Sequence, residues 1–436
     1  MNHKENNRLK SLEFFSMAIK LVFMLICVLL FSAPVNAEEL NNKQVIQSPL
    51  LAQDNLLSAQ NNKEWVVVLS DPRPARLQGW SGEGYSSSDY NGALELKRIG
   101  LKFAKKNGLK LKQEWFIESL SVYCLIVEFT ENTEQTLEAL KKNKFVEWVQ
   151  ESNDFELLNK QVKSDEQEVA GDFNKLIEPS PSKQFEQLDY DGQGIVIAMI
   201  DSGIDDNHRD LSHAIKGMAD FVITNTDQSK SKVEVHGTAI AGVLIAQPNE
   251  KMGISGVAPA AKLLAFRGCW EERNNVTNCN TLSLARALDA VVKSQPDILN
   301  LSLSGPYDPL LNRLIDKVVQ NQTVIVAAYD PTRPSLKRFP LAQDGVLIVR
   351  AESMDAQGKQ EFTAPGAKIV TKPYDAYTYV TGHSIASAHT SGLLALLTQA
   401  RVQDPKFQSI IDKAISGKLK SAQAMVDSLR NQFDSL

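Results

Sequence analysis

Three short segments, far apart in the chain, carry side chains that together could perform acid–base and nucleophilic chemistry. Asp201 follows an apolar run and precedes Ser-Gly, His236 precedes Gly-Thr, and Ser384 lies in Gly-His-Ser-Ile-Ala. A carboxylate that orients a histidine, a histidine that takes a proton and a serine that attacks a carbonyl form a triad for acyl transfer. The order Asp, His, Ser is informative, because unrelated folds build this triad in different chain orders.

Each of the three residues has a plainer interpretation when taken alone. An Asp after a strand often caps a loop, a His before an apolar helix is commonly a core residue, and a Ser at a helix start is usually a cap. The combination favours catalysis. His208 is a second candidate base, but it follows Asp201 closely instead of beginning a helix. Gly-His-Ser also resembles a lipase nucleophile elbow, which needs its acid and histidine after the serine. The histidine that follows Ser384 is His389, on the same predicted helix, so this alternative fails.

The ordered triad with glycine beside each residue resembles the subtilisin-like serine peptidases (subtilases). This resemblance covers nearly everything after residue 37 and implies hydrolysis of peptide bonds through an acyl-enzyme on Ser384. It also implies a substrate-binding segment, because Ser302-Leu303-Ser304-Gly305 looks like the family's Ser-Leu-Gly-Gly. In the family this segment pairs with a peptide by β-augmentation. The plainer interpretation is an ordinary strand end.

The largest departure from the family pattern is in Ala327-Ala328-Tyr329-Asp330. Subtilases usually read Ala-Ala-Gly-Asn here, so Asp330 stands at the oxyanion-hole position. An ionised carboxylate only accepts hydrogen bonds, and loss of the oxyanion donor typically costs roughly a hundred- to a thousandfold in rate. A protonated Asp330 could donate instead, and burial would raise its pKa toward that form. His383 and Ala388 also depart from the family's Gly-Thr-Ser-x-Ala-x-Pro.

These departures leave two functions open. The first is a serine endopeptidase whose activity is reduced or shifted to acidic pH by an atypical oxyanion hole. The alternative is a catalytically impaired pseudo-peptidase that binds peptides or proteins in the retained cleft.

The elements that must position these residues alternate between strand and helix in residues 185–436, which we assign to the peptidase domain. This alternation predicts an α/β fold in which a parallel sheet has helices on both faces. Catalytic groups gather beyond the carboxyl ends of such strands. Strands are expected at 194–200, 261–266, 298–303, 324–328 and 346–349, and helices at 238–245, 282–293, 310–320 and 384–400.

A smaller α+β domain is expected at residues 63–158. Its predicted elements are a strand at 65–69, a helix at 92–107, strands at 110–117 and 121–129, a helix at 133–142 and a strand at 145–149. This βαββαβ order is the ferredoxin-like pattern. It resembles the propeptide of subtilases, which acts as an intramolecular chaperone and inhibitor. A generic ligand-binding domain of the same fold is the alternative. Residues 159–184 are polar and read as a linker open to proteolysis.

The first residues read as a targeting segment. Lysines and an arginine precede an apolar run at 21–31, and small residues close the segment at Ala37. This pattern indicates a signal peptide over 1–37, followed by a flexible arm over 38–62. An uncleaved membrane anchor is the alternative. We expect a secreted or periplasmic protein that meets the membrane only during export.

Composition narrows the remaining possibilities. The net charge of −5 and pI near 5.8 exclude the basic footprint of a nucleic-acid-binding protein. Export makes a local disulfide between Cys269 and Cys279 plausible, with two free thiols as the alternative. Cys124 reads as a buried strand residue. The chemistry requires no cofactor, and no metal ligand set can be assigned, although the family resemblance makes structural calcium possible. The expected partners are a peptide or protein substrate and the chain's own N-terminal domain.

Overall fold

The computed structural model describes residues 63–70, 87–129, 133–158, 190–223, 232–247, 254–272, 276–332, 338–352 and 361–433. The predicted signal peptide, flexible arm and linker lie outside the described residues.

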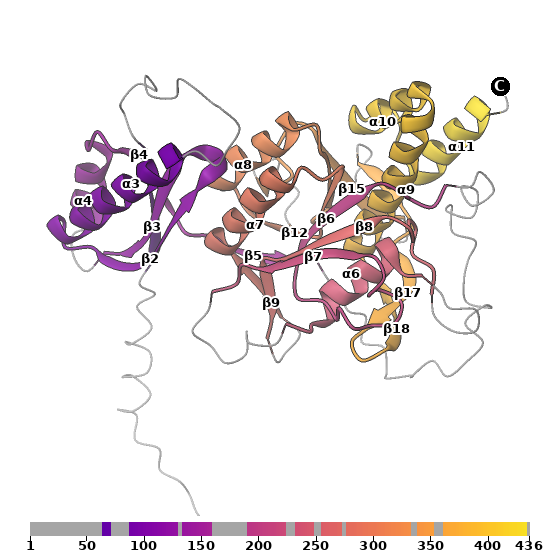
Figure 1. Cartoon of the computed structure of the whole chain (residues 1–436), viewed down its shortest axis with the longest axis horizontal. Helices are drawn as coiled ribbons and strands as arrows, with labels where there is room; N and C mark the ends of the chain where they lie inside the picture. The colour runs from indigo at the N-terminus through magenta and orange to yellow at the C-terminus, as the bar shows by residue number, and fades with distance from the viewer. Residues whose placement is uncertain are drawn as a thin grey trace, which may run out of the picture. The chain divides into compact units, whose positions relative to one another are not determined.

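The N-terminal domain is a four-stranded antiparallel sheet with the strand order β2-β3-β1-β4 and two helices (Figure 1). Its elements follow the order βαββαβ along the chain. They are β1 Glu64–Leu69, α3 Ser87–Lys106, β2 Lys110–Ile117, the short 3-10 helix η1 Glu118–Leu120, β3 Val122–Glu128, α4 Thr133–Lys141 and β4 Val146–Glu151.

Both faces of this small sheet are apolar, and each face is covered. Val67 and Leu69 of β1 pack with Leu96 and Phe103 of α3 in the domain's own core. Because side chains alternate along a strand, the neighbouring residues Val66 and Val68 point the other way. These join a core with residues of the peptidase domain, among them Leu288, Leu311 and Ile315. The continuous valine run in β1 therefore reflects a sheet that is buried on both faces.

The peptidase domain is built on a seven-stranded parallel sheet with the order β16-β15-β13-β11-β6-β8-β7. The predicted α/β class is confirmed. The strands are β6 Val196–Asp201, β7 Ile215–Asp220, β8 Lys262–Arg267, β11 Ile298–Leu301, β13 Val324–Ala328, β15 Val346–Ala351 and β16 Phe362–Ala364. The helices are α6 Val235–Ile245, α7 Thr281–Ser294, α8 Pro309–Gln320, α9 His383–Gln403, α10 Gln408–Ile415 and α11 Ala422–Phe433.

Helices cover both faces of this sheet, and the alternation in β6 shows how. Ile197 and Met199 join the core that contains the apolar residues of α6 and α9. Ala198 and Ile200 join the core on the opposite face, which contains those of α7 and α8. Helices α7 and α8 lie side by side (Figure 1). The strand is apolar from Val196 to Ile200 because both of its faces are buried.

A second sheet crosses between the two domains, with the order β14-β12-β5-β10-β9. Its strands are β5 Asp154–Leu157, β9 Cys269–Glu271, β10 Thr277–Asn280, β12 Leu303–Pro306 and β14 Arg338–Phe339. Strand β5 directly follows the N-terminal domain and is inserted antiparallel between β12 and β10 of the peptidase domain. A hairpin of β17 Ala367–Lys372 and β18 Ala376–Thr381 precedes α9.

The cysteines occupy two different environments. Cys269 and Cys279 form a disulfide that joins β9 to β10. Cys124 is a free thiol in the middle of β3, and burial raises its pKa well above the ordinary value. Over the described residues, the structure contains no helix that is both long enough and apolar enough to cross a membrane.

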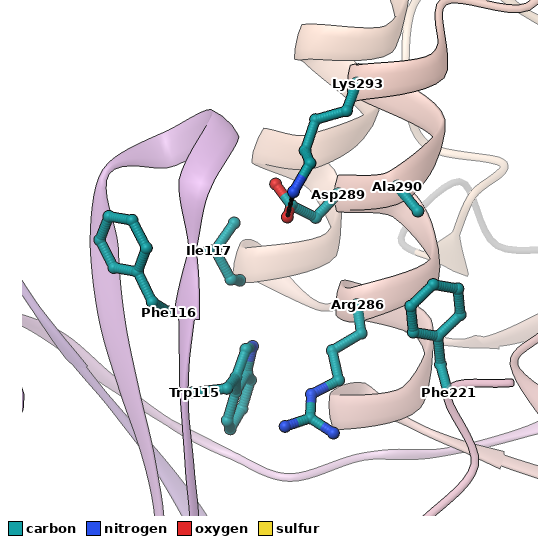
Figure 2. A pocket seen from close by; sticks show the side chains of 8 residues that line it. All are labelled: Trp115, Phe116, Ile117, Phe221, Arg286, Asp289, Ala290 and Lys293. Atoms are coloured by element: carbon teal, nitrogen blue, oxygen red, sulfur yellow. Dashed lines mark ion pairs between the residues drawn. The ribbon is translucent and has the colours of Figure 1, made fainter. Parts of the chain in front are cut away.

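Strand β2 of the N-terminal domain faces helix α7 across a cavity of about 280 Å³ (Figure 2). The Trp115 and Ile117 side chains point toward the helix, and the Arg286 guanidinium lies 5.9 Å from the centre of the Trp115 ring. At one end of the cavity, the Ser119 N–H donates to Asp289 Oδ1 over 2.9 Å. The contact between the domains thus combines apolar packing, a cation–π contact and a hydrogen bond.

A buried carboxylate, Asp308, joins helix α8 to the N-terminal domain. Its Oδ1 accepts hydrogen bonds from the backbone N–H groups of Leu310 and Leu311, which makes it the N-cap of α8. The same oxygen accepts from Gln150 Nε2 over 2.8 Å, and Oδ2 accepts from Asn153 Nδ2 over 3.1 Å. One side chain therefore holds a helix start and two residues of the N-terminal domain.

We predict that Asp308→Ala lowers the free energy of unfolding by roughly 2–4 kcal/mol, because it removes a helix cap and leaves buried donors without an acceptor. Urea unfolding followed by circular dichroism measures this change. Asp316→Ala, on the exposed side of the same helix, is the matched control. Equal midpoints for the two variants would contradict the assigned role of Asp308.

Candidate active site

Asp201 and His236 form a direct hydrogen bond at the carboxyl end of β6. Asp201 is the last residue of the strand, and His236 lies in the first turn of α6. The His236 Nδ1–H donates to Asp201 Oδ1 over 2.6 Å, and the Ser202 N–H donates to the same oxygen over 2.7 Å. Both side chains are buried. Because Nδ1 carries the proton in this arrangement, Nε2 is the nitrogen that can accept one.

The environment of His236 favours its charged form. Burial by itself lowers the pKa of the imidazole, but the charge of Asp201 and its hydrogen bond raise it by more, and the carboxylate of Glu271 adds to this rise. The net result is a raised pKa. Among the described residues, Nε2 has no hydrogen-bond partner. The ring is thus held at one nitrogen and left with a free, basic second nitrogen.

Gly237 allows helix α6 to start this close to β6. A Cβ atom at this position would lie 2.5 Å from the carbonyl oxygen of Ser202 and 2.6 Å from that of Gly203. The absence of a side chain at Gly237 therefore makes room for the backbone that follows Asp201.

Ser384 lies in the first turn of α9 and is fully buried. Its hydroxyl donates to the carbonyl oxygen of Leu158 over 2.8 Å and lies 3.5 Å from that of Ser302. Helix α9 packs against α6, which carries His236. The side chain of Ser384 therefore points at a carbonyl group of the chain's own N-terminal segment.

Leu158 directly follows strand β5, and it continues the pairing of this strand with the segment Ser302–Gly305. Its N–H donates to Ser302 O over 3.0 Å, and the preceding residues pair as Leu157 with Leu303 and Glu156 with Ser304. The segment predicted to bind a peptide by β-augmentation thus pairs with β5 of the same chain.

The ring of Phe155 in β5 packs closely against the backbone of Gly305. A Cβ atom on Gly305 would lie 2.0 Å from the Phe155 ring, so this position must be glycine. The ring is 1% exposed and packs edge-to-face on Phe339 at a centroid distance of 5.6 Å. Gly305 and Phe339 form a pocket for an aromatic side chain.

The carboxylate of Asp330 is satisfied by four donors. Oδ1 accepts from the N–H and the hydroxyl of Thr332 over 2.9 and 2.7 Å, and Oδ2 accepts from the Ser304 hydroxyl over 2.9 Å. The guanidinium of Arg338, itself buried, lies 3.1 Å from Oδ2. The carboxylate is thus held from both its own loop and strands β12 and β14.

The expectation that Asp330 has a raised pKa is wrong. Burial does raise the pKa, but the hydrogen bonds from Thr332 and Ser304 and the charge of Arg338 lower it by more, so the net shift is downward. Four donors favour the ionised form. Asp330 is a charge-compensated carboxylate and holds no proton to donate at neutral pH.

Two of the other departures from the family pattern, Tyr329 and His383, contact each other. The ring of Tyr329 packs edge-on against the ring of His383, with centroids 5.5 Å apart. His383 Nδ1 accepts a hydrogen bond from the Ala351 N–H over 3.0 Å. His383 thereby ties the start of α9 to the end of β15.

The competing histidine, His208, lies outside this site. Its Nδ1 accepts from the Asp210 N–H over 3.1 Å, and its Nε2 lies 3.4 Å from the carbonyl oxygen of Ala376. Within the described residues, no group of three or more His, Cys, Asp or Glu side chains is arranged to hold a metal ion.

Sequence reasoning missed a charged cluster around the start of α6. Arg267 is paired through two 2.9 Å contacts with Glu234, whose Oε2 also accepts from the Gly203 N–H. Glu271 accepts hydrogen bonds from the first N–H groups of α6. Glu234, two residues before His236, was a visible signal, whereas nothing in the sequence connected Glu271 to the helix.

We predict that Asp201→Asn lowers the pKa of His236. Without the charge of Asp201, the burial that lowers this pKa outweighs the remaining charge of Glu271, which raises it. NMR titration of the His236 ring measures this shift, with Ser384→Ala in both chains to keep them intact. Asp205→Asn, a buried carboxylate of the same loop that does not contact the ring, is the control. An unchanged titration in Asp201→Asn would show that the pair does not set the charge of His236.

Comparison with known proteins agrees with this geometry. The profile described as "Subtilase family" matches residues 192–329. The chain is 31% identical to the major intracellular serine protease of Bacillus subtilis (strain 168) over 225 residues, which cover 47% of this chain and 69% of the relative. It is 30% identical over 237 residues to subtilisin E of the same strain, covering 49% of this chain and 60% of the relative. The same values of identity and length hold for subtilisin of Bacillus pumilus, of which 83% is covered. The chain belongs to the subtilase family of serine proteases.

Proposed function

We propose that this chain is an exported serine endopeptidase, made as a zymogen whose residues 63–158 occupy the cleft until they are cleaved off. A single observation carries the proposal. Strand β5 is bound between β12 and β10 as a substrate would be, and the residue that follows it, Leu158, has its carbonyl oxygen 2.8 Å from Ser384 Oγ. The bond after Leu158 is the proposed site of self-cleavage.

The residues of the site provide each step of peptide hydrolysis. Ser384 Oγ turns from the Leu158 oxygen toward His236, gives its proton to Nε2 and attacks the carbonyl carbon. His236 then returns the proton to the leaving amine, which yields an acyl-enzyme that water hydrolyses by the reverse sequence. Asp201 holds the Nδ1–H and stabilises the imidazolium. We infer that the backbone N–H of Ser384, at the start of α9, stabilises the charge that develops on the oxygen.

Strand β5 also suggests which peptides are preferred. It places Leu158 at the reacting carbonyl and Phe155 in the pocket formed by Gly305 and Phe339. We infer a preference for extended segments with leucine before the cleaved bond and an aromatic residue three positions earlier. Backbone pairing with Ser302–Gly305 supplies affinity and the pockets supply selectivity.

The atypical oxyanion hole remains compatible with catalysis because Asp330 is compensated. An isolated carboxylate beside a developing oxyanion would oppose the reaction. Here Arg338 lies 3.1 Å from Asp330, and Ser304 and Thr332 use the remaining acceptor positions. We infer that the Asp330–Arg338 pair presents little net charge to the site, and that the backbone N–H of Ser384 carries most of the oxyanion stabilisation.

Export rests on the basic, apolar and small-residue pattern of residues 1–37. The disulfide between Cys269 and Cys279 supports an oxidising destination, because such bonds persist outside the reducing cytosol.

We predict that the full-length chain cleaves itself between Leu158 and Asn159, whereas Ser384→Ala stays intact. Mass spectrometry and N-terminal sequencing of the exported fraction identify the new end. In the processed protein, a fluorophosphonate should label Ser384. A wild-type chain that behaves like Ser384→Ala in both assays would favour the pseudo-peptidase, the second candidate, which the ionised state of Asp330 supports.

We predict that Arg338→Gln lowers kcat about 10- to 100-fold with little change in KM, because it leaves an uncompensated carboxylate near the oxyanion. Adding Asp330→Asn should recover most of this loss, since the pair then becomes two neutral amides. Rates are referred to active sites titrated with a fluorophosphonate, so that misfolded protein does not contribute. Arg209→Gln, which removes an arginine from a surface pair with Asp375, is the control. A double variant as slow as Arg338→Gln would show that charge compensation is not what Arg338 provides.

A further inference from the structure

The disulfide-linked hairpin of β9 and β10 contacts strand β5 on one side and the backbone of His236 on the other, through two residues that are paired with each other. On the side of β5, Thr277 Oγ1 accepts a hydrogen bond from the Leu157 N–H over 3.2 Å, and Cys279 pairs with Phe155. Directly across the hairpin, Thr277 is paired with Glu271. The hairpin thus places Glu271 opposite the residue that contacts the substrate-like backbone.

The carboxylate of Glu271 caps the helix that carries His236. Its Oε1 accepts from the backbone N–H of His236 over 2.6 Å, and its Oε2 accepts from that of Val235 over 3.0 Å. The hydroxyl of Ser202, the residue after Asp201, lies 3.4 Å from Oε1. One carboxylate therefore contacts both backbone segments that present the Asp201–His236 pair.

Glu271 is itself fixed by the neighbouring charged cluster. Its backbone N–H donates to Glu234 Oε1 over 2.9 Å, and Arg267 binds Glu234 through two further contacts. Arg267 also lies 3.3 Å from Asp220, so the cluster contains a cation. Glu271, by contrast, makes no ion pair with a described Lys, Arg or His side chain, and its negative charge is directed at the start of α6.

We propose that Glu271 is a positioning residue for His236, which it holds by accepting hydrogen bonds from the first N–H groups of helix α6. The proposal rests on the peptidase function proposed above and assigns to this chain a second carboxylate in support of the catalytic base. A negative charge at a helix N-terminus is stabilising, and here the same charge lies beside the group that becomes positive during the reaction.

Charged groups from several elements surround His236. Asp201 faces the ring from β6 and Glu271 faces it from β9, while Glu234, Arg267 and Asp220 form the adjacent cluster. Burial lowers the pKa of His236, and Asp201 and then Glu271 raise it. Neutralising Glu271 therefore moves the pKa of His236 down. The free base persists to lower pH, but the imidazolium of the transition state is less stabilised.

The test compares Glu271→Gln with wild type over pH 5–9, in the processed protein and per titrated active site. We expect kcat to fall about tenfold with KM within about twofold, because a displaced base costs rate rather than binding. The acidic limb of kcat/KM should move to lower pH. Glu272→Gln, which removes an exposed charge one residue along the chain, should match wild type.

Two results would overturn the proposal: an unchanged rate, or a slower enzyme whose acidic limb stays in place, which is the signature of a purely structural role. Thermal unfolding of each variant shows whether it is folded. If wild type fails to cleave peptides, the proposed function fails, but Glu271 can still be tested. NMR titration of the His236 ring in the Ser384→Ala chain needs no turnover, and an identical titration in Glu271→Gln would refute the assigned role.

Discussion

The structure of this chain depends on how it compensates carboxylates that are removed from water. An unpaired buried carboxylate is strongly unfavourable, so each must find donors or a cation. Asp201 is bound by His236, Asp330 by Arg338, and Asp308 by a helix start and two amides of the N-terminal domain. In the proposed reaction, these sites are the base, the oxyanion position and the contact between the domains.

Strand β5 links these places into one arrangement. It continues from the N-terminal domain, completes a five-stranded sheet with strands of the peptidase domain and ends at Ser384. Gly305 leaves the space that the Phe155 ring occupies, and the disulfide joins the two strands on the other side. The same hairpin reaches back to the start of α6 through Glu271. Binding of an extended segment and placement of the base are therefore built from one set of strands.

Several features were predictable because their signals are local. The strands predicted at 194–200 and 324–328 and the helix predicted at 384–400 are found as β6, β13 and α9, with the start of β6 two residues later than predicted. Long buried elements such as these leave continuous apolar patterns. Strands β5, β9, β10 and β14 were missed because each has only two to four residues, at least one of them polar, which is too short for a hydrophobic pattern. They form only because partners from distant parts of the chain supply their hydrogen bonds. The wrong pKa direction for Asp330 has the same origin: its donors Ser304, Thr332 and Arg338 cannot be identified from residue types alone.

The sequence by itself determined the identity and order of Asp201, His236 and Ser384 and the alternation of strands and helices that carries them. The order of the residues and the hydrophobic periodicity can be read from the sequence without knowledge of tertiary contacts. Tertiary structure alone decided that Leu158 lies on Ser384, that Asp330 is paired with Arg338, and that Glu271 caps the helix of His236. These three contacts join groups that are many residues apart in the sequence. They form only when the folded sheets bring those groups together.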